Sequence, residues 1–349
     1  MDRDLVRTKN KPRKGVLILE HGIPHYRYFL FRHLVERLGS ILIIHSGDKF
    51  HERHPFQSIR GANIRLPHRI SLVFFNPLKL LFKDVIITTF NIRKPHTWLF
   101  VLLLPWKKWI LWGQGYGRAK NIFLDCFKRI MAAIAQGYVT YSDVCKKYLV
   151  DIGVRPDKIS VATNTLRVSN HRLTTGSSYL LYVGRVQFRK GLDKVLDAVK
   201  ENGKKVVIVG EGEALASLKK QASNLQIEKL VSFKPSVYDE KKLLGLFSKA
   251  IGYVSPDHVG LGVVHSFSYG VPVITCKNRR HAPEFAYCSD DNSYLYDEDD
   301  DLVRTLDEAM GNRKGNLEKR RMAYRTFCDK LSYVNMIDAF EYHFNRLMI

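Results

Sequence analysis

The sequence predicts an α/β protein built from two units, each a parallel sheet covered by helices. The chain has 349 residues, which is enough for two domains of ordinary size. Short apolar runs alternate with stretches in which apolar residues recur at helical spacing, a pattern typical of parallel strands joined by helices. A polar stretch, Arg167–Ser178, separates two such series and predicts a linker between the units.

The first unit is expected to occupy residues 1–168. Its first buried strand is predicted at Val16–Leu19, because four apolar residues follow one another there, and a helix is predicted at Tyr28–Leu38 from apolar residues at helical spacing. The same two patterns predict the remaining elements, which are strands at Ile41–His45, Val85–Thr89, Trp109–Trp112 and Gly137–Thr140 and a helix at Leu124–Ala135.

The second unit is expected to occupy residues 178–328 and to repeat the same alternation. Its predicted strands are Tyr179–Val183, Val206–Val209, Val231–Phe233, Ile251–Val254 and Val271–Thr275. Its predicted helices are Leu192–Val199, Ala214–Asn224, Lys241–Ser248, Val263–Ser268 and Asp301–Met310. The last segment, 329–349, carries Phe340, Phe344 and Leu347 at helical spacing, and we expect this helix to pack back onto the first unit.

The charge of the chain points to an anionic partner. Lys and Arg total 56 and Asp and Glu total 34, which gives a net charge of +22. Nucleic acid, acidic lipid headgroups and nucleotide phosphates all satisfy this charge. Seven acidic residues fall within Asp290–Asp301; a metal site is one interpretation of this segment, and an exposed turn leading into a helix N-terminus is the other.

Several features indicate a cytoplasmic protein or one that lies on a membrane surface. The five cysteines contain no Cys-x-x-Cys pair, which fits a reducing compartment and no structural zinc. The segment Met1–Lys14 is polar and basic, unlike a secretory signal. The most apolar stretch, Trp98–Trp112, is shorter than the ~20 residues that a membrane span needs and is interrupted by Pro105 and two lysines.

Two glycine-containing loops carry the first chemical signals. In Gly184–Gly191 a predicted strand ends and Arg185 and Lys190 precede a helix, so that a guanidinium, an ammonium and helix amides can hold a diphosphate. After the next strand, Gly210 and Gly212 lack side chains and allow a ligand to approach the backbone, although a plain strand-to-helix connection has the same pattern.

Two later segments add further candidate residues. Gly260 and Gly262 open a helix whose first amides are unbonded, and His265 lies one turn further on. Glu284 follows a proline after a predicted strand, at the carboxyl edge of the sheet where open α/β proteins bind ligands.

These motifs, in this order, resemble the nucleotide-sugar domain of retaining glycosyltransferases of family 4, in the group called glycosyl transferases group 1. The resemblance covers about residues 179–310 and is looser in the N-terminal half, where it rests on His25–Arg27, Trp112–Gly115, Tyr141-Ser142 and Asn164-Thr165. It implies the GT-B fold, in which two Rossmann-like domains face each other across a cleft and bind the acceptor and the donor respectively.

The resemblance also implies roles for individual residues. The catalytic positions are Arg185, Lys190 and Glu284. The donor-binding positions are Gly184, Gly210, Gly212, Asp257, Gly260, Leu261, Gly262 and His265. The acceptor or cleft positions are Gly22, His25, Arg27 and Gln114. Asp257 and His265 stand where the family usually has glutamates that touch the donor sugar and the ribose, and Gln114 stands where many members have histidine.

The function implied is retaining transfer of a sugar from a nucleotide-diphosphate sugar of the UDP or GDP type to a glycan or lipid-linked acceptor, in bacterial surface polysaccharide or lipopolysaccharide synthesis. No metal ion and no other cofactor is expected. A nucleotide-sugar epimerase or a phosphorylase on the same fold is one alternative, and a non-catalytic basic nucleic-acid-binding protein is another; no nucleic-acid-binding module is recognised.

An anionic membrane surface is a further expected partner. Basic clusters in the first unit lie close in sequence to five aromatic residues, Trp98, Phe100, Trp106, Trp109 and Trp112. Most of these aromatics are alternatively interpreted as core residues.

Overall fold

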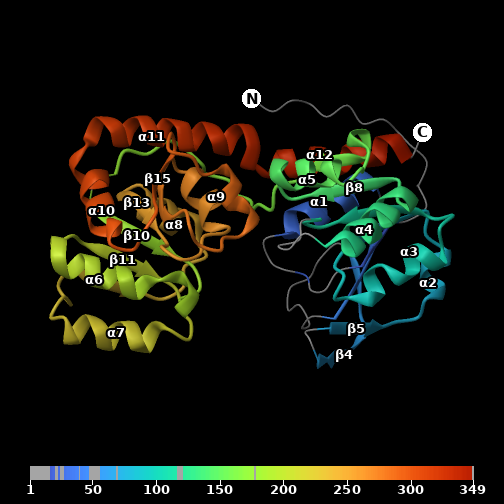
Figure 1. Cartoon of the computed structure of the whole chain (residues 1–349), viewed down its shortest axis with the longest axis horizontal. Helices are drawn as coiled ribbons and strands as arrows, with labels where there is room; N and C mark the ends of the chain where they lie inside the picture. Colours follow the sequence, from blue (N-terminus) through green and yellow to red (C-terminus); the bar gives the residue numbers. More distant parts are fainter. Residues whose placement is uncertain are drawn as a thin grey trace. The chain divides into compact units, whose positions relative to one another are not determined.

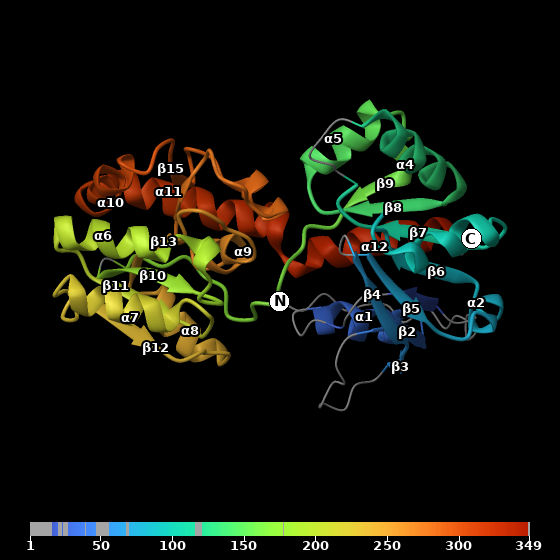
Figure 2. The ribbon, with the colours of Figure 1, turned by 60° about the horizontal axis from the view of Figure 1, so that its bottom comes forward.

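The computed structural model describes residues 16–19, 23, 27–38, 40–46, 56–67, 70–115, 121–176 and 178–347. The chain divides into two compact units. Unit 1 consists of Met1–Ala162 and Ile337–Ile349, and unit 2 consists of Thr163–Met336. Each unit contains a parallel sheet with helices against its faces (Figures 1 and 2).

The sheet of unit 1 has seven strands in the order β3-β2-β1-β6-β7-β8-β9. Every neighbouring pair in it is parallel. Both faces of the central strands are covered, which is why these strands read as unbroken apolar runs in the sequence. The strands are β1 (Val16–Leu19), β2 (Ile41–His45), β3 (Gln57–Arg60), β6 (Val85–Thr89), β7 (Lys108–Trp112), β8 (Gly137–Thr140) and β9 (Ile159–Val161).

Unit 1 also contains a hairpin and six helices among its described residues. The hairpin pairs β4 (Ala62–Leu66) with β5 (Ile70–Phe74) in antiparallel fashion. The helices are α1 (Tyr28–Leu38), α2 (Leu78–Leu81), α3 (Leu99–Leu103), α4 (Ile122–Ile134), α5 (Asp143–Asp151) and most of α12 (Tyr333–Leu347). Side-chain caps start two of them, since the oxygens of Asn121 and Ser142 accept hydrogen bonds from the first turns of α4 and α5.

Helix α12 packs on the sheet and on α1 within unit 1. The Phe340 ring lies edge-on to Trp112 with 4.9 Å between centroids. His33 of α1 hydrogen-bonds Glu341 at 2.9 Å, and His343 hydrogen-bonds the Ser160 hydroxyl at 2.9 Å. The C-terminal helix therefore supplies both apolar and polar contacts to the unit that the first half of the chain builds.

The sheet of unit 2 has six strands in the order β12-β11-β10-β13-β14-β15, and all neighbouring pairs are parallel. The strands are β10 (Tyr179–Val183), β11 (Val206–Val209), β12 (Val231–Lys234), β13 (Ala250–Val254), β14 (Val273–Cys276) and β15 (Ser293–Tyr296). The α-helices are α6 (Leu192–Asn202), α7 (Leu215–Asn224), α8 (Glu240–Phe247), α9 (Gly262–Phe267), α10 (Asp301–Gly311) and α11 (Arg313–Thr326).

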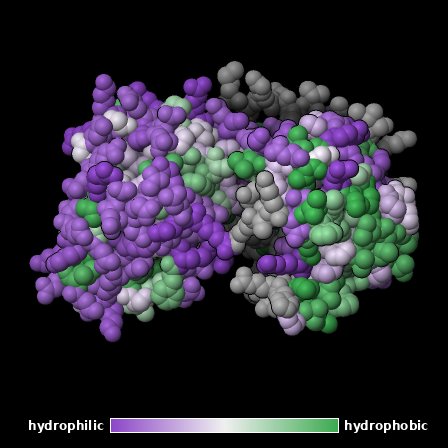
Figure 3. Space-filling model, in the orientation of Figure 1, coloured by the Kyte–Doolittle hydropathy of each residue, from purple (hydrophilic) through white to green (hydrophobic). Residues whose placement is uncertain are grey.

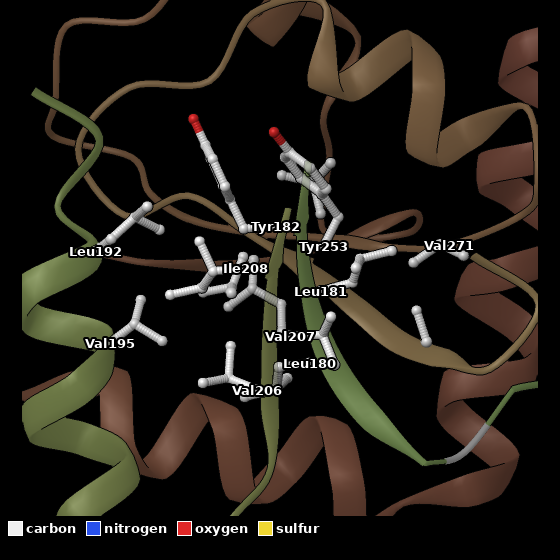
Figure 4. Packing of buried hydrophobic residues seen from close by; sticks show 14 of the residues in the cluster. Leu180, Leu181, Tyr182, Leu192, Val195, Val206, Val207, Ile208, Tyr253 and Val271 are labelled. Atoms are coloured by element: carbon white, nitrogen blue, oxygen red, sulfur yellow. The ribbon is translucent and has the colours of Figure 1, made fainter. Parts of the chain in front are cut away.

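The core of unit 2 forms between this sheet and its helices (Figure 4). Leu180, Leu181 and Ile208 are buried at the centre of β10 and β11, and Leu192 and Val195 of α6 lie against them. Burial of this kind stabilises each large aliphatic side chain by about 1.5–3 kcal/mol. The rigid sheet that results holds the loops at its carboxyl edge in place.

A buried arginine, Arg320 of α11, ties the irregular segment 167–178 to unit 2. Its guanidinium donates to the carbonyl oxygens of Thr174 and Gly176, both at 2.9 Å, and to that of Ala250 in β13. Burial lowers the pKa of Arg320 to about 10, so the group stays charged at neutral pH. The segment that the sequence predicted as a linker has no helix or strand among its described residues, but it is firmly bonded to unit 2.

Most predicted elements are present within one or two residues of their expected bounds, and several were missed. The missed elements are β3, β4, β5, β9, β15, α2, α3, α5 and α11. The missed strands are short and the missed helices are short or strongly polar, so their apolar pattern is weak. None of the helices in the described part of the chain is both long enough and apolar enough to cross a membrane.

Candidate functional site

The candidate site in unit 2 is built from four loops at the carboxyl edge of its sheet. From β10 the chain adds β11 and then β12 towards one edge of the sheet, and it returns to the other side of β10 to add β13, β14 and β15 towards the opposite edge. The strand order therefore reverses between β10 and β13. Ligands of open α/β sheets bind at such a reversal. Every donor-binding and catalytic residue predicted for this half of the chain lies in the loops that follow β10, β11, β13 and β14 or in the first turns after them.

Arg185 lies in the loop after β10, and its backbone position is well fixed. Its carbonyl oxygen accepts a hydrogen bond of 2.6 Å from the Tyr182 hydroxyl, and the next amide, that of Val186, donates to the Glu211 carbonyl at 2.8 Å. The side chain is exposed, and among the described residues its guanidinium has no hydrogen bond or ion pair. All of its N–H donors are therefore available to a ligand.

Lys190 connects the two sides of the reversal point. Its ammonium donates to the His258 carbonyl, in the loop after β13, with a distance of 2.9 Å from Nζ to O. Burial and the charge of Arg189 lower the pKa of Lys190 to about 8, although the Glu284 carboxylate acts in the opposite direction. The lysine is thus a partly desolvated cation that a nearby anion would stabilise.

Glu284 contributes a buried carboxylate from the turn Pro283–Tyr287, and only 2% of the residue is exposed. One carboxylate oxygen accepts a hydrogen bond from the Asn164 side-chain amide at 2.8 Å. The other lies beside Gly260, 3.8 Å from the point that a Cβ there would occupy. The start of α9, Lys190 and Glu284 are therefore close neighbours.

The backbone around Gly260–Gly262 leads into α9. Among the described residues, no acceptor is found for the amide N–H groups of Gly260, Leu261 and Gly262. A Cβ at Gly262 would lie only 2.3 Å from the Tyr253 hydroxyl, so this position has no room for a side chain. The predicted donor-binding role of these three residues stays a prediction.

Gly210 and Gly212 serve the packing of one loop on another. A Cβ at Gly210 would lie 1.9 Å from the Gly184 carbonyl oxygen, and one at Gly212 would lie 2.2 Å from that of Val186. The missing side chains therefore let the backbone of the loop after β10 approach this loop closely. The predicted donor-binding role of the two glycines stays a prediction.

Asp257 is held in an ion-pair cluster. Its carboxylate accepts hydrogen bonds from Lys194 at 2.7 Å and from Arg279 at 3.1 Å, and the same two cations bind Asp299 at 2.9 and 2.7 Å. Asp299 belongs to the acidic segment Asp290–Asp301. Within the described ranges, no group of three or more His, Cys, Asp or Glu side chains is placed to share a metal ion.

His265 is neutral and packs among aromatic rings. Its ring lies 4.9 Å from that of Phe247 and 6.0 Å from that of Tyr269, between centroids. Burial lowers the pKa of His265 to about 4. A neutral imidazole both donates and accepts, which suits contact with a hydroxyl group better than with a phosphate.

Sequence reasoning missed His281, which joins the loops after β13 and β14. Its Nδ1 accepts from the Val259 amide at 3.1 Å and its Nε2 donates to the Cys276 carbonyl at 2.7 Å, so the ring is the neutral tautomer with hydrogen on Nε2. Burial lowers the pKa of His281, in keeping with this assignment. The residue lies three positions before Glu284, and its place after a predicted strand was the available signal.

In unit 1, Arg27 and Gln114 are the predicted cleft residues that the structure describes; Gly22 and His25 lie outside the described residues. Arg27 is buried, with its guanidinium carbon 4.1 Å from the centre of a Trp112 ring and its Nη2 donating to the Tyr141 hydroxyl at 3.1 Å. Gln114 is exposed.

Comparison with known sequences finds a family match in the C-terminal half of the chain. Residues 167–326 match the model of the family described as glycosyl transferases group 1. The O-antigen chain mannosyltransferase C of Escherichia coli is 28% identical over 233 residues, covering 62% of this chain and 59% of that protein. The D-rhamnosyltransferase WbpZ of Pseudomonas aeruginosa is 32% identical over 163 residues, 44% of this chain and 42% of that protein. The chain thus aligns with less than two thirds of the length of each relative.

Solved structures extend the likeness to the whole fold. HepE of Anabaena, in complex with UDP, superposes with a TM-score of 0.70 at 12% identity, covering 96% of this chain and all of that one. A glycosyltransferase from Rickettsia africae superposes with a TM-score of 0.74 at 14% identity, covering 97% of this chain and 99% of that one. The fold is therefore GT-B, as the sequence predicted.

Proposed function

We propose that this chain, whose residues 167–326 belong to glycosyl transferases group 1, transfers a sugar from a nucleotide-diphosphate sugar to a glycan or lipid-linked acceptor. One observation carries the proposal: Arg185 and Lys190, in the loop after β10, and Glu284, after β14, lie at the carboxyl edge of the unit 2 sheet, where the strand order reverses. Two cations and a buried carboxylate at that position suit a ligand with a diphosphate and a sugar.

The reaction breaks the bond between the anomeric carbon and the donor phosphate oxygen, and it forms a bond from that carbon to an acceptor hydroxyl oxygen. The hydroxyl proton passes to the departing diphosphate, and the anomeric configuration is retained when attack occurs on the face that the diphosphate leaves. Negative charge accumulates on the leaving oxygen, so preorganised cations lower the barrier. We propose that Arg185 and Lys190 supply them, without a metal ion.

The other residues have proposed supporting roles. We propose that Glu284 accepts a hydrogen bond from sugar hydroxyls near the start of α9 and that neutral His265 bonds a ribose hydroxyl. Asp257 is a weaker candidate for a sugar contact, because Lys194 and Arg279 already use its Oδ1. Arg27, stacked on Trp112 in unit 1, is a candidate acceptor contact.

The names of similar proteins support the wider setting. Two relatives in sequence are the O-antigen mannosyltransferase and the rhamnosyltransferase, and a structural neighbour is the lipopolysaccharide outer core galactosyltransferase WaaB. We propose a role in assembling a bacterial surface polysaccharide at the cytoplasmic side of the inner membrane. The UDP complex of HepE supports a nucleotide-diphosphate donor, of the UDP or GDP type.

A two-step experiment tests this function. Thermal unfolding is first measured with UDP, GDP, ADP and their sugars, and one nucleotide class should raise the midpoint. The stabilising donor is then incubated with candidate acceptors, with and without a chelator, and the anomeric configuration of the product is read by NMR. Transfer with retention and in chelator supports the proposal. Conversion of the donor with no acceptor present indicates an epimerase, and stabilisation by nucleic acid alone would contradict the assignment.

A further inference from the structure

Unit 1 exposes an apolar surface that its own fold does not explain. Three segments contribute large apolar side chains that point to solvent: α2 with the residue after it, α3 with the loop after it, and the outer side of α4. We call this surface the apolar face. Its members are Leu78, Leu81, Phe82, Leu99, Leu102, Leu103, Trp106, Ile122, Phe123 and Ile130.

The three segments are neighbours, so their apolar side chains form one surface. Trp98, at the start of α3, packs edge-on against Phe127 of α4 with 5.1 Å between ring centroids. Lys107 donates hydrogen bonds to the carbonyl oxygens of Leu81 and Lys83, which fixes the end of α2 beside the loop after α3. Figure 3 shows hydrophobic residues spread over the side of unit 1 that carries α3, α4 and the β4–β5 hairpin, whereas the visible side of unit 2 is mostly hydrophilic.

The exposed side chains on this face are too large and too numerous for an ordinary water-facing surface. Phe82, Trp106 and Phe123 are 79%, 70% and 82% exposed. Contiguous apolar patches on soluble proteins usually mark an interaction site. Trp109 and Trp112, which the sequence also offered as surface aromatics, are buried in β7, so Trp106 is the tryptophan that reaches solvent most fully.

The charge around the apolar face selects its partner. Residues 56–134 contain thirteen Lys and Arg against two Asp and no Glu. Lys79 and Lys83 flank the apolar residues of α2, and Arg129 precedes Ile130 on α4. One of the two acids, Asp125, is already paired with Lys128 at 3.0 Å.

We infer that the apolar face docks onto an anionic lipid bilayer. Aliphatic and aromatic side chains would enter the interfacial region, while the surrounding lysines and arginines bind acidic headgroups. A second copy of this chain fits less well, because a symmetric contact would bring two strongly basic surfaces together. Nucleic acid fits less well because seven of the ten residues of the apolar face are leucine or isoleucine, which offer no ring for a base to stack on. The inference does not depend on transferase activity.

Co-sedimentation of the full chain with vesicles tests the docking directly. Vesicles of phosphatidylethanolamine alone are compared with vesicles that also hold about 30% phosphatidylglycerol, and binding should be strong only to the second kind and should weaken with salt. The double variant Phe82→Ser/Trp106→Ser should lower the partition coefficient about tenfold or more. Tyr238→Ser, which removes an aromatic side chain 82% exposed on unit 2, is the matched control and should bind like the native protein.

Two further measurements locate the contact. Brominated lipids should quench the fluorescence of Trp106, and most of that quenching should be lost in Trp106→Phe, because Trp109 and Trp112 are buried and Trp98 is only partly exposed. Lys79→Glu/Lys83→Glu should weaken binding to the anionic vesicles, whereas Lys219→Glu/Lys220→Glu on α7 of unit 2 should not.

The variants remove exposed side chains, so their thermal unfolding midpoints should match that of the native protein. If Phe82→Ser/Trp106→Ser does not fold, Ile122→Ser/Phe123→Ser tests the same surface from α4. Equal binding by all variants, binding that ignores anionic lipid, or a concentration-dependent dimer abolished by the same substitutions would each overturn the inference.

Discussion

The protonation of Lys190 should control donor binding between pH 7 and pH 9. With a pKa of about 8, about 90% of Lys190 is protonated at pH 7 and about 10% at pH 9. If only the ammonium form binds the donor diphosphate, the dissociation constant should rise about tenfold over this range. An ordinary lysine with a pKa of 10.5 would stay charged and give no change.

Other groups beside the site do not titrate in this window. Burial lowers the pKa values of His258 and His281, so both rings are already neutral at pH 7. Burial raises the pKa of Tyr182 beyond the range. The diphosphate of a nucleotide sugar joins two esters and does not titrate in this window. A uracil or guanine base begins to ionise at its upper end, but it does so equally for the native protein and for Lys190→Arg. The part of the change in affinity that Lys190→Arg lacks can therefore be assigned to Lys190.

Stability should move in the opposite direction, which separates lost affinity from unfolding. The folded-state pKa of Lys190 lies below the unfolded-state value, so burying its charge lowers the free energy of unfolding most below about pH 8. That cost fades as the pH rises from about 8 through 10.5, and above this range both states are neutral. The contribution of Lys190 to stability thus rises with pH while donor affinity falls.

Isothermal titration of the nucleotide sugar at several pH values measures the effect. Lys190→Arg keeps a charge that does not titrate, and its affinity should change much less than that of the native protein from pH 7 to pH 9. Lys190→Met should bind weakly at every pH. The reasoning fails if the native protein binds equally well at pH 7 and pH 9, or if Lys190→Arg shows the same pH dependence as the native protein.

Substitutions at three places in unit 2 make further predictions. Arg185→Ala should reduce turnover about 100-fold or more in a transferase assay, because a cation facing the leaving group is lost, whereas Arg189→Ala in the same loop should change it little. Asp257→Asn and Asp299→Asn should each lower the free energy of unfolding by about 1 kcal/mol in urea titrations, because both carboxylates pair with the same partly exposed cations. If Asp257→Asn loses more turnover than Asp299→Asn, Asp257 contacts the sugar. Arg320→Met should cost about 3–5 kcal/mol in the same titrations, because several buried carbonyl oxygens lose their donor, and a cost near zero would show that water replaces it.

The sequence predicted the inner strands well and the outer elements poorly, for a physical reason. Tyr179–Val183 and Val206–Val209 have neighbours on both sides and helices on both faces, so every residue must be apolar and the run is visible. Strand β15 pairs with β14 but lies inside the acidic segment, where charged residues hide its short apolar run. Helix α11 is strongly polar and owes its place to Asn316 and Arg320, which no periodicity reveals.

The candidate site was predictable as a set of loops but not as a set of contacts. Motif order and the carboxyl-edge rule place Lys190 and Glu284 at one edge of the sheet. The bond from Lys190 to the His258 carbonyl joins residues 68 apart in sequence, and that from Asn164 to Glu284 joins residues 120 apart. Contacts of this kind depend on strand order and loop shape, which local sequence does not encode.

Two lysines four residues apart in the sequence show how the fold keeps a charge available for a ligand. Lys194 is partly buried, but hydrogen bonds to Asp257 and Asp299 raise its pKa, so its charge is neutralised within the protein. Lys190 has a main-chain carbonyl as its hydrogen-bond acceptor, and its pKa is lowered. If Asp257 turned to Lys190 instead, the ammonium would be paired and a diphosphate would have to displace a carboxylate. The ion pairs with Lys194 and Arg279 therefore keep the Asp257 carboxylate away from Lys190. The ammonium of Lys190 can then pair with the anion of an incoming ligand.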